Sequence, residues 1–277
     1  MKKKDKFAAV DAALDMRVFR TSVAPPDEPL KPHKSSYKSH NVELTYPLGL
    51  SVRDQSTLFA LLYLAAKYRK IDEQFGQEIV FKTTYSEISQ ESGYKSATTE
   101  VVKESIQRLQ ATSYKRTKDP ERDALPLIEM DEEQHIKIHP RLSRSIDSLI
   151  SKKDKAKHPY FRIELDERKE LMTGKHSAQA TLIHAWFSST VQQKKLSYFT
   201  NISTLLERVS SIAEIKSDSL TQKRYRCKQA LLRMEDIDWA VFEETGLEDK
   251  KVSVMRVPKV VPSKLKRLSF DTWSKLN

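Results

Sequence analysis

Cysteine and glycine are both scarce in this chain, and each shortage narrows the chemistry that it can perform. Its 277 residues include 1 cysteine, Cys227, which excludes an internal disulfide and a zinc cage of several cysteines. The 5 glycines leave little material for a phosphate-binding loop. Gly174 and Lys175 are followed by His176 instead of Ser or Thr, and residue 169 is Lys rather than Gly. We therefore expect no nucleotide-driven helicase and no cofactor.

Long apolar runs are missing as well, whereas positive charge is in excess. No stretch approaches the roughly 18 consecutive apolar residues of a membrane span. Asp11, Asp15 and Arg17 interrupt the apolar run that a signal peptide would need after its lysine-rich start. The sequence thus predicts a cytoplasmic protein without a membrane partner. With 49 Lys and Arg against 38 Asp and Glu, the net charge of +11 favours a polyanion such as nucleic acid.

Composition divides the chain into four segments. Residues 1–40 begin with lysines and end rich in proline and serine, which predicts a flexible basic N-terminal arm. Residues 41–155 and 156–258 are each expected to fold as one domain, joined by a lysine-rich connection around residues 152–157. Residues 259–277 are expected to form a C-terminal tail.

The sequence of the first domain predicts a short helix, a turn, a second helix and a hairpin of strands, in this order. Thr84 can cap a short helix that Gly93 ends. Ser96 then opens a second helix, in which three apolar residues share one face, namely Val102, Ile106 and Leu109. Extended segments follow at residues 112–118 and 125–139. This order is typical of a winged helix.

The second half repeats the same order. A strand, a long helix, two shorter helices and two final strands are expected at residues 160–165, 177–193, 202–209, 219–235, 239–242 and 251–257. Recurrence of one element order is stronger evidence than either copy alone. The sequence therefore predicts an α+β fold, mainly helical, made of two tandem winged-helix domains, each a helix-turn-helix with a β-wing.

The helix expected at residues 219–235 has a basic polar face. On a helical wheel an apolar side is formed by Leu220, Cys227, Leu231 and Met234. Arg and Gln can pair bidentately with guanine and adenine edges, and flanking lysines suit phosphate contacts. The candidate DNA-binding residues on the other sides are Gln222, Lys223, Tyr225, Arg226, Lys228, Gln229 and Arg233. A solvated basic face without a ligand is the alternative interpretation.

The corresponding helix of the first domain has a face of mixed sign. Glu100 and Glu104 lie opposite its apolar side and would repel phosphates. We therefore expect the first domain to contribute less affinity for DNA and to make protein contacts in addition. Its candidate DNA-binding residues are Ser96, Lys103, Gln107 and the wing residues Lys115, Arg116 and Lys118.

Three segments in order carry a resemblance to a known family. They are Leu220-Thr-Gln-Lys-Arg-Tyr-Arg-Cys-Lys-Gln-Ala-Leu with Trp239 after it, Thr84-Tyr85-Ser86-Glu87-Ile88 with Gly93 and the helix ending Ile106-Gln-Arg-Leu109, and Phe161-Arg-Ile-Glu-Leu-Asp-Glu-Arg-Lys-Glu-Leu171. Over roughly residues 41–258 the chain resembles the RepC-type replication initiators of IncQ-like plasmids.

The resemblance implies two winged helices that bind tandem direct repeats (iterons) at a plasmid origin. Binding would promote opening of adjacent AT-rich DNA and loading of a replicative helicase. The implied partners are double-stranded DNA with direct repeats, single-stranded AT-rich origin DNA, the helicase, and other copies of the chain on adjacent repeats. The implied recognition positions are Tyr225, Arg226 and Gln229 with their neighbours, and residues 96–107 in the first domain.

Two other functions stay open. A transcriptional repressor that binds an operator could use the same fold and charge. A metal-dependent nicking initiator or relaxase would need metal ligands, for which His135 and His139 are candidates. Residues 135–139 alternate between polar and apolar, so we interpret them as a strand with both histidines and Lys137 on its exposed face. We therefore assign no catalytic residue or metal ligand and expect a non-enzymatic protein.

Overall fold

The computed structural model describes residues 6–21, 32–37, 40–46, 49–69, 78–94, 99–116, 125–150, 158–190, 197–209, 219–237, 239–243 and 251–256. The chain is an α+β protein of helices and small sheets, the class that the sequence predicts. It divides into two compact units, Met1–Lys169 (unit 1) and Glu170–Asn277 (unit 2). The division falls within α5 (Leu165–Leu171), not near residue 155 as expected.

Unit 1 is built around the long helix α1 (Val52–Tyr68). Ser51 and Asp54 begin it with a capping box, in which the Asp54 carboxylate accepts a hydrogen bond of 2.7 Å from the Ser51 backbone N–H. Residues 58–62 are all fully buried, so this stretch is covered on every side. The helices α2 (Tyr85–Ser92), α3 (Thr99–Gln110) and α4 (Pro140–Ile150) all pack against α1.

Helices α2 and α3 begin and end largely as the sequence predicts. The Thr84 hydroxyl caps α2 by accepting a hydrogen bond of 3.1 Å from the Glu87 backbone N–H. Gly93 ends the helix with φ of 82°, a left-handed conformation that glycine adopts without steric cost. The predicted apolar face of α3, formed by Val102, Ile106 and Leu109, is buried. Ser96 lies outside the described residues.

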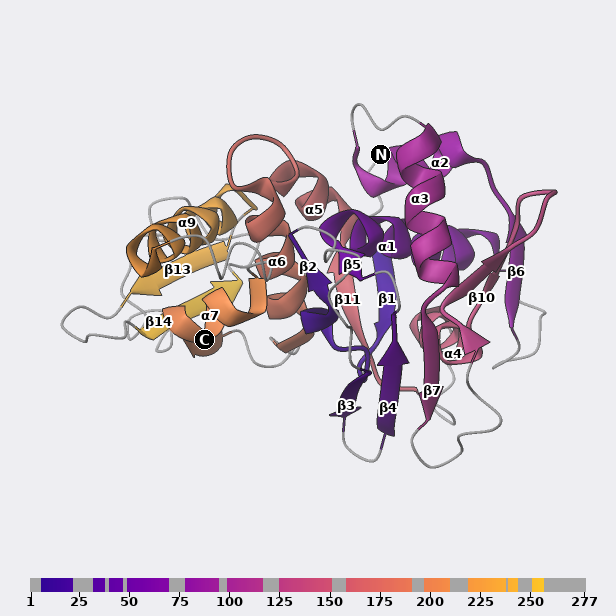
Figure 1. Ribbon diagram of the computed structural model, residues 1–277, viewed down its shortest axis with the longest axis horizontal. Coiled ribbons are helices and arrows are strands. Elements are labelled where there is room, and N and C mark those ends of the chain that lie inside the picture. Colours follow the sequence, from indigo (N-terminus) through magenta and orange to yellow (C-terminus); the bar gives the residue numbers. More distant parts are fainter. Residues whose placement is uncertain are drawn as a thin grey trace. The chain divides into compact units, whose positions relative to one another are not determined.

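A three-stranded antiparallel sheet accompanies these helices, with the order β6-β10-β9 (Figure 1). Its strands are β6 (Ile79–Lys82), β9 (Ile128–Met130) and β10 (His135–Ile138). Ile136 and Ile138 are buried as the alternation predicts. The prediction that His139 lies on the exposed face is wrong, because β10 ends at Ile138 and α4 begins at Pro140. His139 is buried, and its Nδ1 accepts a hydrogen bond of 3.2 Å from the Arg141 backbone N–H.

The segment expected as the first wing strand belongs to a different sheet. β7 (Ser113–Arg116) lies between β4 (His40–Thr45) and β8 (Leu125–Pro126) in a sheet of order β3-β4-β7-β8, with β3 (His33–Tyr37) at one edge. Lys115 is paired with Glu43 across β4 and β7. Lys115 and Arg116 belong to β7, which pairs antiparallel with β8 as the predicted pairing of residues 112–118 with the segment from Leu125 requires. They are not residues of the β9–β10 hairpin.

The N-terminal segment is part of the core of unit 1. β1 (Phe7–Asp11) pairs antiparallel with β11 (Tyr160–Glu164), and Ala8 lies opposite Ile163. Further on, η1 (Met16–Val18) leads into β2 (Phe19–Arg20), which pairs in parallel with β5 (Leu50–Ser51). The alanine and valine side chains of β1 are fully buried. The expectation of a flexible arm over residues 1–40 is therefore wrong for residues 6–21.

Asp11 holds the end of β1 in a buried network of charges. One carboxylate oxygen, Oδ2, lies 3.0 Å from both Arg141 Nε and His158 Nε2, and the other accepts a hydrogen bond of 2.8 Å from the Ala13 backbone N–H. Burial alone would raise the pKa of Asp11. Hydrogen bonding to His158 and the charge of Arg141 outweigh that effect and hold the pKa below its usual value.

In unit 2, the succession of helices and strands begins with helix α6 (Ser177–Thr190). There follow β12 (Ser197–Asn201), α7 (Ile202–Val209), α9 (Leu220–Leu232), η3 (Arg233–Ile237), β13 (Trp239–Glu243) and β14 (Lys251–Arg256). The strands form an antiparallel sheet of order β12-β14-β13. Gly246 and the tail at residues 259–277 lie outside the described residues.

The core of unit 2 gathers aromatic side chains from α6 and β13. The ring of Trp239 stacks on that of Phe187 with centroids 6.4 Å apart and meets the edge of His184 at 5.9 Å. Cys227 of α9 is buried, and burial raises the pKa of its thiol to about 12. Cys227 therefore acts as a small apolar residue of the core.

One order of elements recurs in both units, as predicted. Unit 1 has α1, β6, α2, α3, β9 and β10, with β7 and β8 inserted after α3. Unit 2 has α6, β12, α7, α9, β13 and β14. In each sheet the last of these strands lies between the other two. Helix α9 thus occupies in unit 2 the position that α3 occupies in unit 1.

Candidate nucleic-acid interface

Helix α9 is fixed in unit 2 by its apolar side and by a cap at its start. Cys227 and Leu231 are buried, together with Met234 just beyond the helix, and α9 packs against α6 and α7. The Ser219 hydroxyl accepts a hydrogen bond of 3.2 Å from the Gln222 backbone N–H. The remaining sides of α9 are therefore turned to solvent in a defined orientation.

Replacing Ser219 with alanine should lower the free energy of unfolding of unit 2 by about 1 kcal/mol, because the cap satisfies a backbone donor of the first turn. Urea unfolding followed by tryptophan fluorescence measures this change. Ser219→Asn, which preserves a capping oxygen, should keep the wild-type midpoint. Equal losses in both variants would contradict a capping role.

The predicted residues of α9 are brought together on its solvent side. Tyr225 is 59% exposed, and Gln222 and Lys228 are also exposed. Lys223, Arg226 and Gln229 are partly buried. The helix contains four Lys and Arg residues, all within residues 223–228, and no acidic residue. A face of this kind attracts polyanions.

Two residues of α9 differ from the helical-wheel prediction. Leu220, assigned to the apolar side, is 57% exposed, because it is the first residue of the helix and lies beyond the core. Arg224 is exposed, although the wheel places it nearer the apolar side. Sequence reasoning missed Arg224, since a wheel gives angles but not where along the helix the core ends.

Arg233 has a structural role instead of the predicted place on the DNA-binding face. Its Nη1 donates hydrogen bonds to the carbonyl oxygens of Thr173 at 2.8 Å and Lys175 at 3.0 Å. Its Nε donates to the Asp236 carboxylate at 2.6 Å. The guanidinium is thus occupied by backbone and carboxylate oxygens of unit 2.

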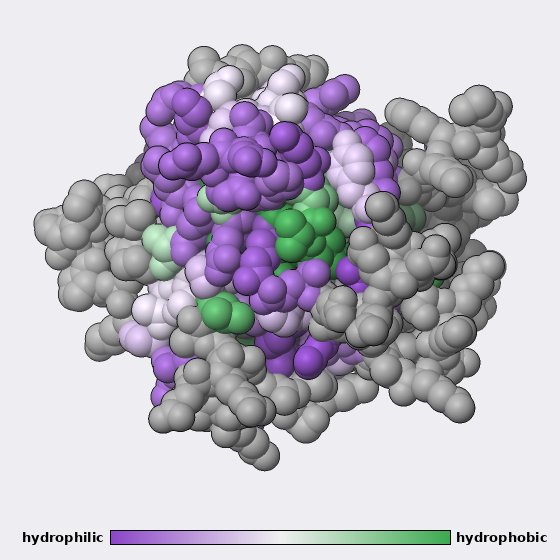
Figure 2. Space-filling view, turned by 90° about the vertical axis from the view of Figure 1, so that its right-hand side faces the viewer, coloured by the Kyte–Doolittle hydropathy of each residue, from purple (hydrophilic) through white to green (hydrophobic). Residues whose placement is uncertain are grey.

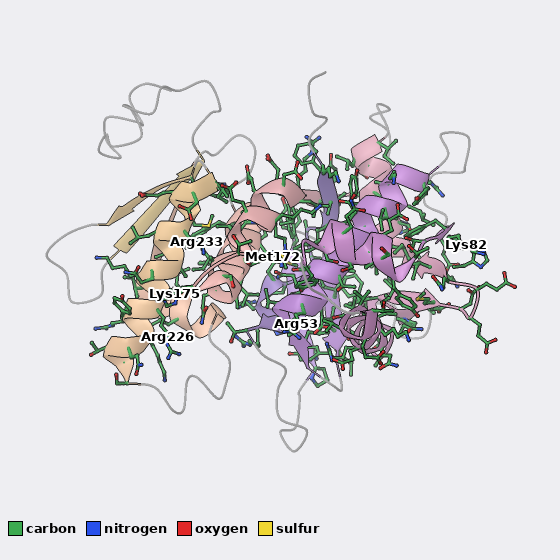
Figure 3. All side chains as sticks on the ribbon, turned by 90° about the horizontal axis from the view of Figure 1, so that it is seen from above. Arg53, Lys82, Met172, Lys175, Arg226 and Arg233 are labelled. Carbon is green, nitrogen blue, oxygen red and sulfur yellow. The ribbon has the colours of Figure 1, made fainter. Side chains whose placement is uncertain are left out.

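The loop of residues 172–176, between α5 and α6, lies against α9 (Figure 3). The side chain of Lys175 is exposed, and the ring of His176 meets the edge of the Tyr225 ring with centroids 6.5 Å apart. Neither residue was predicted, because they precede α9 by some 45 residues and only the folded chain brings them to it.

Helix α3 of unit 1 presents the expected face of mixed sign. Glu100, Glu104 and Gln107 are exposed. Lys103 Nζ lies 3.7 Å from a Glu100 carboxylate oxygen and 5.7 Å from the centre of the Tyr85 ring. This face therefore carries less positive field than α9.

Acidic residues also occupy the tip of the β9–β10 hairpin. Asp131, Glu132 and Glu133 are all exposed there. Asp131 accepts a hydrogen bond of 2.8 Å from the His135 backbone N–H, which closes the turn. Figure 2 views the right-hand side of Figure 1, and hydrophilic residues cover most of its described surface. The hairpin tip would repel a phosphate backbone.

The other candidates of unit 1 do not join α3. Lys115 Nζ lies 3.1 Å from Glu43 Oε1 on the four-stranded sheet. Arg116 ends β7, and Lys118 lies outside the described residues, as Ser96 does. The predicted set of unit 1 is thus divided between two surfaces, whereas most of the set of unit 2 forms one.

Two further properties of the described residues bear on what the chain can bind. No group of three or more His, Cys, Asp or Glu side chains within the described ranges is arranged to hold a metal ion. Among the helices that the structure describes, none has the length and apolar character required to cross a membrane.

A comparison with models of known protein families finds a match for this chain. The family of replication protein C (RepC) matches residues 48–256, which is most of the chain. No curated protein matches the chain. The chain belongs to the RepC family. It is therefore a plasmid replication protein, as the resemblance at the sequence level implied.

Proposed function

We propose that this protein is a replication initiator that binds tandem direct repeats (iterons) at a plasmid origin through two winged-helix domains. The observation that carries the proposal is the position of α9, a basic helix directly before the β13–β14 hairpin. A winged helix uses the helix in this position to enter the major groove. Membership of the RepC family supports the same function.

The repeated architecture supports the assignment of two winged helices. Each unit has a first helix, a strand, two further helices and a hairpin, and in each sheet the last strand is central. This arrangement suits a helix-turn-helix followed by a β-wing. Two DNA-binding domains in one chain can cover a long DNA repeat. Direct repeats place adjacent protein copies on the DNA in the same orientation.

The balance of charged residues differs between the two units, and this difference supports unequal contributions of the units to DNA binding. All charged residues of α9 are basic. By contrast, α3 exposes Glu100 and Glu104, and the β9–β10 hairpin exposes the acidic residues 131–133. Unit 2 therefore supplies most of the affinity and sequence selection in the proposed complex. Unit 1 contributes less, through Lys103, Gln107 and the four-stranded sheet that holds Lys115.

The proposed mechanism uses binding energy and no covalent step. Copies bound to adjacent repeats bend the duplex, and bending a site costs a few kcal/mol that phosphate contacts offset. The strain favours opening of AT-rich DNA beside the repeats, where a replicative helicase then loads. The chain works in the cytoplasm, on double-stranded repeats and on the single strands that opening exposes.

Binding to DNA of defined geometry tests this proposal. Affinity is measured at several salt concentrations for the replicon's own direct repeats, for an inverted repeat from its promoter, and for scrambled DNA of the same composition. Selective binding to the direct repeats at physiological salt supports the initiator. Preference for the inverted repeat would indicate a repressor, and strand cleavage with Mg²⁺ or Mn²⁺ would indicate a nicking enzyme. Equal binding to all three would contradict specific recognition.

Arg226→Ala should weaken binding to the direct repeats by about 1–3 kcal/mol and binding to scrambled DNA much less, because a base contact discriminates between sequences. Fluorescence anisotropy with both DNAs measures the two losses. Arg144→Ala, which removes an exposed arginine of α4 in unit 1, is the matched control and should leave both affinities unchanged. Equal losses on both DNAs for Arg226→Ala would make Arg226 a phosphate contact.

A further inference from the structure

The 172–176 loop is held against α9 more firmly than a surface connection requires. The Arg233 guanidinium donates to the carbonyl oxygens of Thr173 and Lys175 at 2.8 Å and 3.0 Å, and Nη2 donates to that of Glu170 at 3.5 Å. Glu170 lies in the last turn of α5, whose final carbonyl groups have no partner within the helix, and Thr173 and Lys175 follow the helix end. The planar fork of an arginine can serve several such acceptors at once.

Gly174 permits this close approach. Its φ is 84°, a left-handed conformation in which other residues are strained, and a Cβ at this position would lie 3.3 Å from Arg233 Nη1. His176 also has a positive φ, of 58°. The backbone of the loop is therefore shaped around the guanidinium, and this shape determines where the Lys175 and His176 side chains project.

The loop borders the basic face of α9 on the described surface of unit 2. Lys175 is exposed, and His176 contacts Tyr225, the one aromatic residue of α9, whose side chain is largely exposed. Figure 3 shows Lys175 beside α9, near Arg226 and Arg233. A lysine at the border of a recognition helix is placed to contact a phosphate of the strand that passes the helix.

We propose that the 172–176 loop forms a second side of the DNA-binding surface of unit 2, in which Lys175 contacts a phosphate of the duplex that α9 reads. Arg233 is a positioning residue that holds Lys175 there, and Gly174 makes the position possible. This inference rests on the proposed function of unit 2. It assigns Lys175 and Arg233 roles that the charge pattern of α9 alone does not.

The salt dependence of DNA binding tests the contact. In the full-length protein, Lys175→Gln should lower affinity several-fold on direct repeats and scrambled DNA alike. It should make the slope of log K against log salt shallower by about 0.9, the value for one lost phosphate contact on B-DNA. Lys82→Gln, which changes an exposed lysine of β6 in unit 1, is the matched control and should keep the wild-type slope.

Arg233→Lys tests the positioning role, because it keeps the charge but removes the fork. If Arg233 acts by holding the loop, this substitution should reduce the slope as Lys175→Gln does, and the double variant should lose no more than either single one. A wild-type slope for Arg233→Lys together with a reduced slope for Arg233→Gln would make Arg233 itself a phosphate contact and overturn the inference. Circular dichroism checks that the variants are folded.

The outcomes separate this inference from the proposed function. Absence of any preference of the wild-type protein for direct repeats would contradict the proposed function. Preference for the repeats, lost in Arg226→Ala, together with an unchanged slope in Lys175→Gln, would overturn the inference alone. Lys175→Gln alters an exposed side chain and preserves the fold, so the result is decisive even if Arg233→Lys fails to fold.

Discussion

Replacing Asp11 with alanine should destabilise unit 1 by about 3–5 kcal/mol, because the substitution leaves Arg141 and His158 buried without the carboxylate between them. All three side chains are buried, and Asp11 is fully so. The same substitution removes the carboxylate that links the end of β1 to Arg141 of α4. Denaturant unfolding followed by far-ultraviolet circular dichroism should show a lower midpoint for the variant.

The pH dependence of this loss follows from the pKa of Asp11. Because the pKa is held below its usual value in the folded protein, the network stabilises unit 1 at pH values above the unfolded pKa of about 4. The stabilisation is lost as the pH falls through the folded pKa, so wild type and variant should converge in acid. Glu133→Ala removes an exposed carboxylate and should stay within about 0.5 kcal/mol of wild type. A wild-type midpoint for Asp11→Ala at neutral pH would show that β1 is not part of the core.

Replacing Phe187 with alanine should destabilise unit 2 by about 3–5 kcal/mol, since the cavity would open beneath the stacked ring of Trp239. Trp186 and Trp239 are buried in unit 2, so their fluorescence follows the unfolding of that unit. The fluorescence midpoint in urea should therefore fall. DNA binding should fail at temperatures where the variant unit is unfolded, because α9 packs on α6.

Leu220→Ala is the matched control for this experiment. It also shortens an apolar side chain of unit 2, but one that is largely exposed at the start of α9. Its midpoint should stay close to wild type. A loss as large as that of Phe187→Ala would mean that Leu220 is a core residue, as the helical wheel placed it. An unchanged midpoint for Phe187→Ala would contradict the packing of α6 against β13.

Features encoded by neighbouring residues were predictable from the sequence. The cap of α2 at Thr84, its end at Gly93 and the buried face of α3 each depend on residues within a few positions of one another. The two successions of elements, and with them the α+β class, followed from such local patterns. Strand pairings were not predictable, because β1 and β11, or β4 and β7, lie far apart in the chain and no single-sequence pattern links them.

The residues of the candidate site can likewise be separated into those that a local sequence pattern predicts and those that it does not. The basic face of α9 was predictable, since the spacing of one helix determines which side chains share a face. The role of Arg233 was not, because its partners are backbone carbonyl oxygens of another segment. Lys175 carries no signal of its own in the sequence, and only the folded loop brings it to α9.

The pairing of β1 with β11 has a consequence for how the chain is made on the ribosome. Strand β1 needs as its partner residues 160–164, which are synthesised after nearly all the rest of unit 1. Until then the nascent chain must expose the apolar residues of β1, although domains commonly fold as units while synthesis continues. Completion of the sheet of β1 and β11 therefore waits until residues 160–164 have been synthesised.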